Sequence, residues 1–257
     1  MIRIQTIGEG PPLVLLHGWA MHGGVFAPLI QVLAPHRTLH VVDLPGHGDS
    51  PWNAEHAFTL RVCVDALVPN IPRAPWLGWS LGGLVALRAA IDGSDHVTGI
   101  VALAATPRFT RAPDWPNAVE DALLDEFARG LEVDHRATVK RFLALEAHGS
   151  DHLREDLRFL QHEILARPAP HPRVLQDGLA VLRETDMRAE LGRLSIPSLW
   201  IGGRRDRLVP PSALEASARL APGGEAVSIA HAGHAPFLSH ADAVARAVLD
   251  WLETHAL

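Results

Sequence analysis

The seven residues LGWSLGG at positions 77–83 decide the fold. They contain the pattern Gly-x-Ser-x-Gly, centred on Ser80, between an apolar run and a stretch rich in leucine and alanine. Glycines are needed because a strand that turns sharply into a helix strains the backbone of the serine and crowds its neighbours. The pattern predicts a serine hydroxyl that projects from the carboxyl end of a strand, with a helix N-terminus behind it to favour developing negative charge.

Further strands are expected on both sides of this turn. Continuous apolar runs predict buried strands at residues 13–16, 38–42, 76–79 and 99–104, and the strand pattern resumes at residues 198–202 and 226–229. Residues 81–91 and 242–254 are helical in pattern. Strands separated by helices form parallel sheets, whose chemistry sits at the carboxyl ends of the strands. We therefore expect an α/β fold with a mostly parallel central sheet flanked by helices.

The middle of the chain breaks this alternation. Residues 107–187 are charged, helical in pattern and punctuated by prolines, and they contain no strand run. We expect them to form an inserted helical lid on one core made of residues 1–106 and 188–257.

The composition excludes several classes of protein. The chain has 257 residues, a net charge of −6 and a single cysteine, Cys63, so it has no internal disulfide, and nucleic acid is disfavoured as a partner. Cys63 is expected to be a packed small hydrophobe in a helix. The start lacks the features of a signal peptide, and no apolar stretch approaches the ~20 residues of a membrane-spanning helix. We expect a cytoplasmic protein with no membrane partner.

A nucleophilic serine needs a base, and the base needs an orienting acid. In this architecture the acid precedes the histidine in the chain. Asp206 follows the predicted strand 198–202, and His234 follows the predicted strand 226–229, so both can converge with Ser80 at one edge. Two rivals stay open, His231 as the base and Asp186 as the acid.

The tetrahedral oxyanion of acyl transfer needs two backbone N–H donors. Residues 17–19, His-Gly-Trp, end the first strong strand. The expected donors are the amides of Trp19 and of Leu81, which follows the serine. His17 is interpreted as the residue that organises this loop.

Together these motifs resemble the esterases of the α/β-hydrolase fold, through LLHGW at 15–19, DLPGHGDS at 43–50 and the serine turn. The resemblance is closer to the BioH family of pimeloyl-[acyl-carrier protein] methyl ester esterases. It is carried by LGWSLGGLVA at 77–86, RFLAL at 141–145 and HAPF at 234–237. It extends over nearly the whole chain, including residues 107–187.

The resemblance implies hydrolysis of the methyl ester of pimeloyl on acyl carrier protein, with release of methanol, in biotin synthesis. Ser80 would be the nucleophile, His234 the base and Asp206 the acid that orients it, in a monomer with no metal and no cofactor. The implied substrate contacts are Trp19, Ser80, Leu81, Phe142, Leu143, Ala144, Leu145, Glu146 and His234.

Members of this family dock their acidic carrier protein through arginines of the lid. Arg141, Arg154 and Arg158 stand at matching positions, and the last two, four residues apart, would share one helix face. Where the family has a further arginine, this chain has Ala137. Because acidic residues are interspersed, the alternative is a solvated surface with local ion pairs.

Other functions remain possible from the sequence. The same catalytic residues would serve a broad-specificity short-chain carboxylesterase or lactonase, since selectivity lies outside them. A hydrolase-fold binding protein without turnover is a weaker alternative, and Ser80 disfavours dehalogenase chemistry, which uses an aspartate there. His148 and His152 are four apart, but Gly149 lies between them and no glutamate follows His148, which disfavours a metal site.

Overall fold

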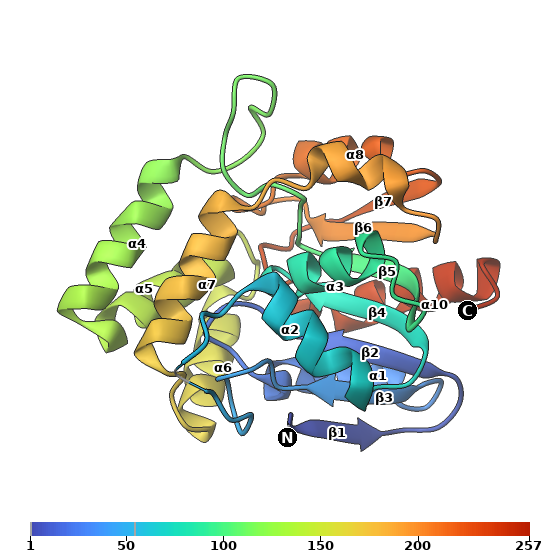
Figure 1. Cartoon of the computed structure of the whole chain (residues 1–257), viewed down its shortest axis with the longest axis horizontal. Helices are drawn as coiled ribbons and strands as arrows, with labels where there is room; N and C mark the ends of the chain where they lie inside the picture. Colours follow the sequence, from blue (N-terminus) through green and yellow to red (C-terminus); the bar gives the residue numbers. More distant parts are fainter. Residues whose placement is uncertain (1, 54) are drawn as a thin grey trace.

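A computed structural model describes residues 2–53 and 55–257 (Figure 1). A seven-stranded sheet has the order β1-β3-β2-β4-β5-β6-β7. Only the edge strand β1 runs antiparallel, to β3, so the sheet is mostly parallel as predicted. The strands are β1 (Ile4–Ile7), β2 (Pro12–Leu16), β3 (Thr38–Val42), β4 (Ala74–Trp79), β5 (Val97–Leu103), β6 (Ser198–Gly203) and β7 (Gly224–Ile229). The sequence predicted all of these strands except β1.

Helices cover both faces of the sheet. In the view of Figure 1, α2 (Leu60–Leu67), α3 (Leu81–Ile91) and α8 (Pro211–Leu220) lie in front of it. Helix α10 (Ala241–Thr254) lies behind and packs on α1 (Ala27–Leu33). The residues of β4 and β6 are all buried, which explains their unbroken apolar sequence. Cys63 is buried in α2, where burial raises the pKa of its thiol, as expected for a packed residue.

Four helices follow one another between β5 and β6. They are α4 (Asp121–Val133), α5 (His135–Ala147), α6 (Leu153–Ala166) and α7 (Pro172–Glu184). They pack on each other, α4 against α5 and α7, and α5 against α6. We call α4–α7 the four-helix segment; Figure 1 shows it gathered beyond one end of the sheet. In the part of the chain that the structure describes, no helix is long and apolar enough to cross a membrane.

Candidate active site

Ser80 stands at the turn between β4 and α3, where the sequence predicted it. Its backbone is strained, with φ 53° and ψ −116°, because strand and helix meet there without a linker. The Ser80 N–H donates to the Leu103 carbonyl over 3.0 Å, and its own carbonyl accepts from the Gly83 N–H over 2.9 Å. A side chain at position 78 would overlap the backbone of Gly82. The glycine of the motif therefore permits the close approach of strand and helix that forms the turn at Ser80.

Asp206 and His234 form a buried hydrogen-bonded pair. His234 Nδ1 lies 2.8 Å from Asp206 Oδ2, and the two side chains are 1% and 0% exposed. Asp206 Oδ1 accepts from the N–H groups of Leu208 and Val209, which fixes the carboxylate. Since a carboxylate only accepts, Nδ1 carries the proton and Nε2 has a free lone pair. Among the described residues, His234 Nε2 is buried and has no hydrogen-bond partner. The imidazole is thus held ready to take a proton.

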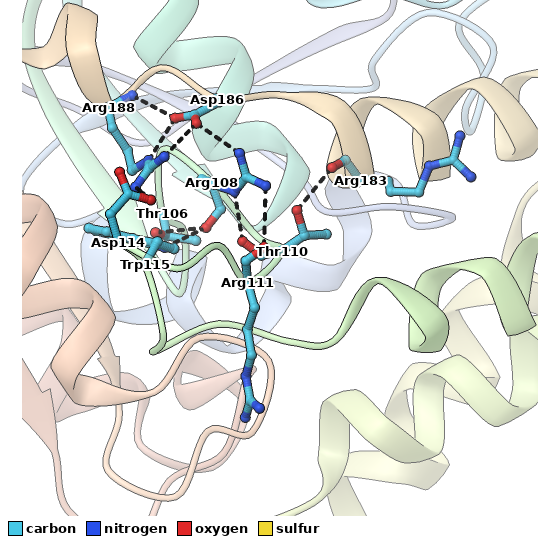
Figure 2. A network of polar contacts seen from close by, with 9 residues as sticks. All are labelled: Thr106, Arg108, Thr110, Arg111, Asp114, Trp115, Arg183, Asp186 and Arg188. Atoms are coloured by element: carbon cyan, nitrogen blue, oxygen red, sulfur yellow. Dashed lines mark hydrogen bonds and ion pairs between the residues drawn. The ribbon is translucent and has the colours of Figure 1, made fainter.

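The alternative base, His231, and the alternative acid, Asp186, form their contacts with other residues. His231 is 60% exposed; it contacts Arg205 and lies 3.3 Å from Asp151. Asp186 belongs to a separate network (Figure 2), in which it accepts from Arg108 and Arg188. These arginines lower the pKa of the Asp186 carboxyl. The carboxylate that contacts the His234 imidazole belongs to Asp206.

The Asp186 network fixes the loop that leaves β5. Arg188 also pairs with Asp114 over 3.0 Å and stacks on the Trp115 ring, while Trp115 Nε1 donates to the Arg108 carbonyl (Figure 2). Because these contacts join residues 108–115 to residues 186–188, they tie together the two chain segments that lead into and out of the four-helix segment. The network is therefore structural.

His17 organises the loop that carries Trp19. Its Nε2 accepts from the Leu44 N–H over 2.9 Å, so Nδ1 is the donor to the Gly18 carbonyl at 2.8 Å. Burial lowers the pKa of His17 to about 3, which keeps the ring neutral. Leu81 begins α3, and the first N–H groups of a helix have no intrahelical acceptor. The role of the Trp19 and Leu81 amides as oxyanion donors stays a prediction.

Three residues support the site through contacts that were not predicted, although Trp79 was expected to line the acyl channel with Trp19 and Phe142. Trp79, the middle residue of Gly-Trp-Ser, donates its indole N–H to the His234 carbonyl over 2.9 Å. Asp43 accepts from the N–H groups of Gly23 and Asp49, at 2.7 and 3.0 Å, and so holds the loop beside Trp19. His47 is buried edge-on to His17, with ring centroids 5.1 Å apart. Burial lowers the pKa of His47 to about 3. For Asp43 and His47, the only indication in the sequence was the DLPGHGDS motif to which both belong.

Helix α5 brings part of the predicted substrate segment to the site. Phe142 and Leu143 are buried, and the Phe142 ring meets Trp19 with centroids 4.6 Å apart. Glu146 is also fully buried. Leu145 is half-buried, and Ala144 is exposed, so the side chain of Ala144 lies off the buried face.

The loop between α5 and α6 rests on the loops of both Asp206 and His234. The Asp151 N–H donates to the His231 carbonyl over 3.1 Å, and the Asp151 carboxylate pairs with Arg205. A side chain at Gly233 would overlap the carbonyl of His148. The four-helix segment is thus pressed directly against the acid and base loops.

The three predicted docking arginines are all exposed on α5 and α6. Arg141 pairs with Glu126 and lies over the Phe127 ring, and Arg158 pairs with Glu155 over 3.4 Å. Arg154 shares α6 with Arg158, as predicted, and has no ion-pair partner among the described residues. His148 ends α5 and His152 precedes α6, so they share no helix. The described residues contain no group of three or more potential metal ligands.

Comparisons with known proteins agree with this fold and identify the family. The model of the α/β-hydrolase fold family matches residues 11–241. A pimeloyl-[acyl-carrier protein] methyl ester esterase of Stenotrophomonas maltophilia (strain K279a) is 53% identical over 249 residues, 96% of this chain and 95% of that protein. A protein of the same name from Xanthomonas oryzae pv. oryzae (strain MAFF 311018) is 52% identical, over 96% of this chain and 97% of its own length.

Solved structures show the same fold. An esterase from Exiguobacterium antarcticum superposes with a TM-score of 0.86 at 20% identity, over 98% of this chain and 95% of its own. At that identity the likeness concerns the fold, whereas the two relatives match across both the core and the four-helix segment. The chain therefore belongs to the α/β-hydrolase fold family and, within it, to the pimeloyl-[acyl-carrier protein] methyl ester esterases, which are carboxylic ester hydrolases.

Proposed function

We propose that this enzyme hydrolyses the methyl ester of pimeloyl-[acyl-carrier protein], as a cytoplasmic monomer, and releases methanol and the free carboxylate for biotin synthesis. The observation that carries the chemistry is the buried Asp206–His234 pair with an unpartnered Nε2. The substrate is supported by the names of relatives that are 53% and 52% identical along almost their whole length.

Acylation begins with the Ser80 hydroxyl. Its oxygen attacks the ester carbonyl while His234 Nε2 takes its proton, and Asp206 stabilises the imidazolium through Nδ1. The N–H groups of Trp19 and Leu81 stabilise the oxyanion of the tetrahedral intermediate. Collapse breaks the bond to the methoxy group, which leaves as methanol with the proton from His234. The acyl group stays on Ser80.

Deacylation repeats these steps with water. His234 Nε2 takes a proton from a water molecule, whose oxygen attacks the acyl-enzyme. The second tetrahedral intermediate collapses, the proton returns to Ser80, and the acid leaves. Every proton moves between water, the substrate groups, His234 and Ser80, so water is the only co-reactant that the reaction needs.

The acyl chain is expected to lie along Trp19 and Phe142. Both rings are buried, and they meet at 4.6 Å between centroids. Each methylene group that such a surface removes from water contributes ~0.8 kcal/mol to binding. This interaction favours a pimeloyl chain over acetyl.

The carrier protein is expected to dock on α5 and α6 through Arg141, Arg154 and Arg158. The unpaired guanidinium of Arg154 is available to an acidic partner. The pairs of Arg141 and Arg158 with Glu126 and Glu155 are exposed, and exposed pairs contribute little to stability. Both arginines can therefore exchange partners when an acidic helix approaches.

The test compares methanol release from carrier-bound pimeloyl methyl ester with hydrolysis of p-nitrophenyl acetate, by the wild type and by Ser80→Ala. We expect a higher kcat/KM on the carrier-bound ester and loss of both activities in the variant. Rescue of a biotin-requiring strain that lacks its own esterase, by the wild type only, supports the same role. Equal kcat/KM values and no rescue would indicate the broad-specificity carboxylesterase or lactonase instead.

A further inference from the structure

Glu146 is an anomaly on the buried face of α5. The buried residues of this helix recur in pairs, at 138–139, 142–143 and 146–147, as expected for one face of a helix. Val139, Phe142 and Leu143 occupy that face, and Glu146 continues it into the last turn. The spacing calls for an apolar residue at this position, and the chain has a carboxylic acid.

The carboxyl group of Glu146 is buried without a partner. Its residue is 0% exposed, and neither Oε1 nor Oε2 has a hydrogen-bond partner among the described residues. An ionised carboxylate that is buried and unpaired is very unfavourable, and such a group stays protonated instead. Burial, and then the nearby Asp206 carboxylate, raise the pKa of Glu146 well above its ordinary value.

In the part of the chain that the structure describes, no cation contacts the Glu146 carboxyl. Arg205, next to Asp206 in the chain, is directed to the surface, where it pairs with Asp151 and contacts His231. On α6, the buried carboxyl of Asp156 is hydrogen-bonded to Ser150 and Ser239 and lies near His152 and His240. On the side of α4, Arg141 pairs with Glu126 in an exposed contact. The charged group that acts on Glu146 is Asp206, which in turn is bonded to His234.

We propose that Glu146 is a positioning residue. While the Glu146 carboxyl is neutral, it keeps the end of α5 against the Asp206–His234 pair, and loss of the Glu146 proton at alkaline pH stops hydrolysis. A negative charge on Glu146 would be buried without a partner and would repel the Asp206 carboxylate. This repulsion would push the end of α5 away from the loops of Asp206 and His234, and the geometry in which His234 takes the Ser80 proton would be lost. The inference rests on the roles proposed above for Asp206 and His234.

The effect on stability has a definite sign. Above pH ~4.3 the glutamate of the unfolded chain loses its proton while the folded protein keeps it. The folded state then binds more protons, so its stability falls as pH rises, until Glu146 itself ionises in the folded protein. In that window the ratio of folded to unfolded protein falls up to about tenfold per pH unit.

The decisive variant is Glu146→Gln, which keeps the shape and cannot ionise. Two quantities are measured between pH 5 and 10: kcat/KM for p-nitrophenyl acetate, and the urea midpoint of unfolding. We expect the pH at which kcat/KM falls on the alkaline side to rise by one unit or more. We also expect the loss of stability with rising pH to become less steep, by about tenfold per pH unit in the ratio of folded to unfolded protein. Glu146→Met should do the same, which separates charge from hydrogen bonding.

The matched control is Glu155→Gln, an exposed glutamate on α6. It should reproduce both wild-type pH profiles. The proposal is overturned if Glu146→Gln and Glu146→Met follow the wild-type profiles, or if the wild type shows no alkaline fall. Failure of the proposed function can be told apart from failure of this proposal. If the proposed function is wrong, Asp206→Asn keeps full activity, whereas the stability profiles of the Glu146 variants do not depend on catalysis.

Discussion

The loops at the carboxyl ends of β4, β6 and β7 and the four-helix segment face each other, but different contacts hold them. In the loops, Ser80, Asp206 and His234 are buried and held by hydrogen bonds to their backbone groups, and the loops of Ser80 and Asp206 follow strands β4 and β6, whose residues are all buried. The four-helix segment is joined to the core by scattered contacts. These include His22 with the Glu163 carbonyl at 2.7 Å, the Phe58 N–H with Asp177 at 2.8 Å, and the pairs Arg167–Asp49 and Arg205–Asp151.

This difference separates two tasks. Residues fixed by a buried sheet hold a reacting geometry to within a fraction of an ångström, which bond-making requires. Helices whose contacts with the core are in part exposed and polar are easier to displace, and they present the exposed arginines and the Phe142 ring, which meets Trp19. We therefore expect changes in the loops to affect kcat for every ester, and changes in the four-helix segment to affect particular substrates.

The change with the largest expected effect on kcat is Ser80→Ala, in the loop that follows β4. Loss of a nucleophile lowers kcat by roughly 10⁶-fold, because the remaining groups only stabilise charge. The same loss is expected for a carrier-bound ester and for p-nitrophenyl acetate, measured at equal enzyme concentration. An unchanged circular dichroism spectrum shows that folding is intact. A variant that kept a tenth of the activity would remove Ser80 from the chemistry.

The second change compares Asp206→Asn with Asp186→Asn. Asparagine at 206 favours the wrong tautomer of His234, and we expect kcat to fall by about 10⁴-fold with little change in KM. Asp186→Asn weakens only the network with Arg108 and Arg188, so kcat should stay within about threefold of the wild type. Steady-state kinetics on p-nitrophenyl acetate measures both. The opposite ranking would make Asp186 the acid.

The third prediction concerns acid stability and His47, which lies against His17 in the loop that carries Trp19. Its pKa is lowered to about 3 in the folded protein. Between about pH 6.5 and that value the unfolded chain binds the extra proton, so stability falls as pH falls. His47→Gln should make this fall shallower by about 1.4 kcal/mol per pH unit, measured by urea unfolding between pH 4 and 6.5. Exposed His56→Gln is the control and should leave the slope unchanged.

The smallest expected effect is on kcat/KM for the carrier-bound ester, and it tests the role of the four-helix segment in docking. Arg154→Glu reverses the charge of an exposed, unpaired arginine, and we expect kcat/KM for the carrier-bound ester to fall by about tenfold. Hydrolysis of p-nitrophenyl acetate should not change. Arg246→Glu, exposed on α10, is the matched control and should affect neither substrate. Equal losses on both esters in Arg154→Glu would show a structural defect instead of docking.

The sheet was largely predictable because buried parallel strands are continuous apolar runs. Residues 198–202 and 226–229 were found as β6 and β7, and the predicted helix 81–91 matches α3. The missed strand β1 has the sequence IQTI, which is too short and too polar to stand out, and it exists because its backbone pairs with β3. An edge strand of this kind depends on tertiary pairing with its neighbour and not on its own sequence pattern.

The place of the candidate site residues in the fold was predictable for a related reason. Ser80, Asp206 and His234 each follow a recognisable strand, and parallel strands deliver their carboxyl ends to one edge. The choice of Asp206 over Asp186 was open in the sequence and needed the 2.8 Å contact with His234. The unpartnered burial of Glu146 was not predicted, although its spacing from Val139 and Phe142 was a signal.

The contact between Gly233 and the His148 carbonyl limits how this enzyme can be recombined with its relatives. A chimera that exchanges only the four helices keeps one partner of this contact and replaces the other. The loop at 148–151 and the loop at 231–233 have to be inherited together, although about eighty residues of sequence separate them. The boundary at which substrate selectivity can be transplanted therefore runs through the loop that carries the base.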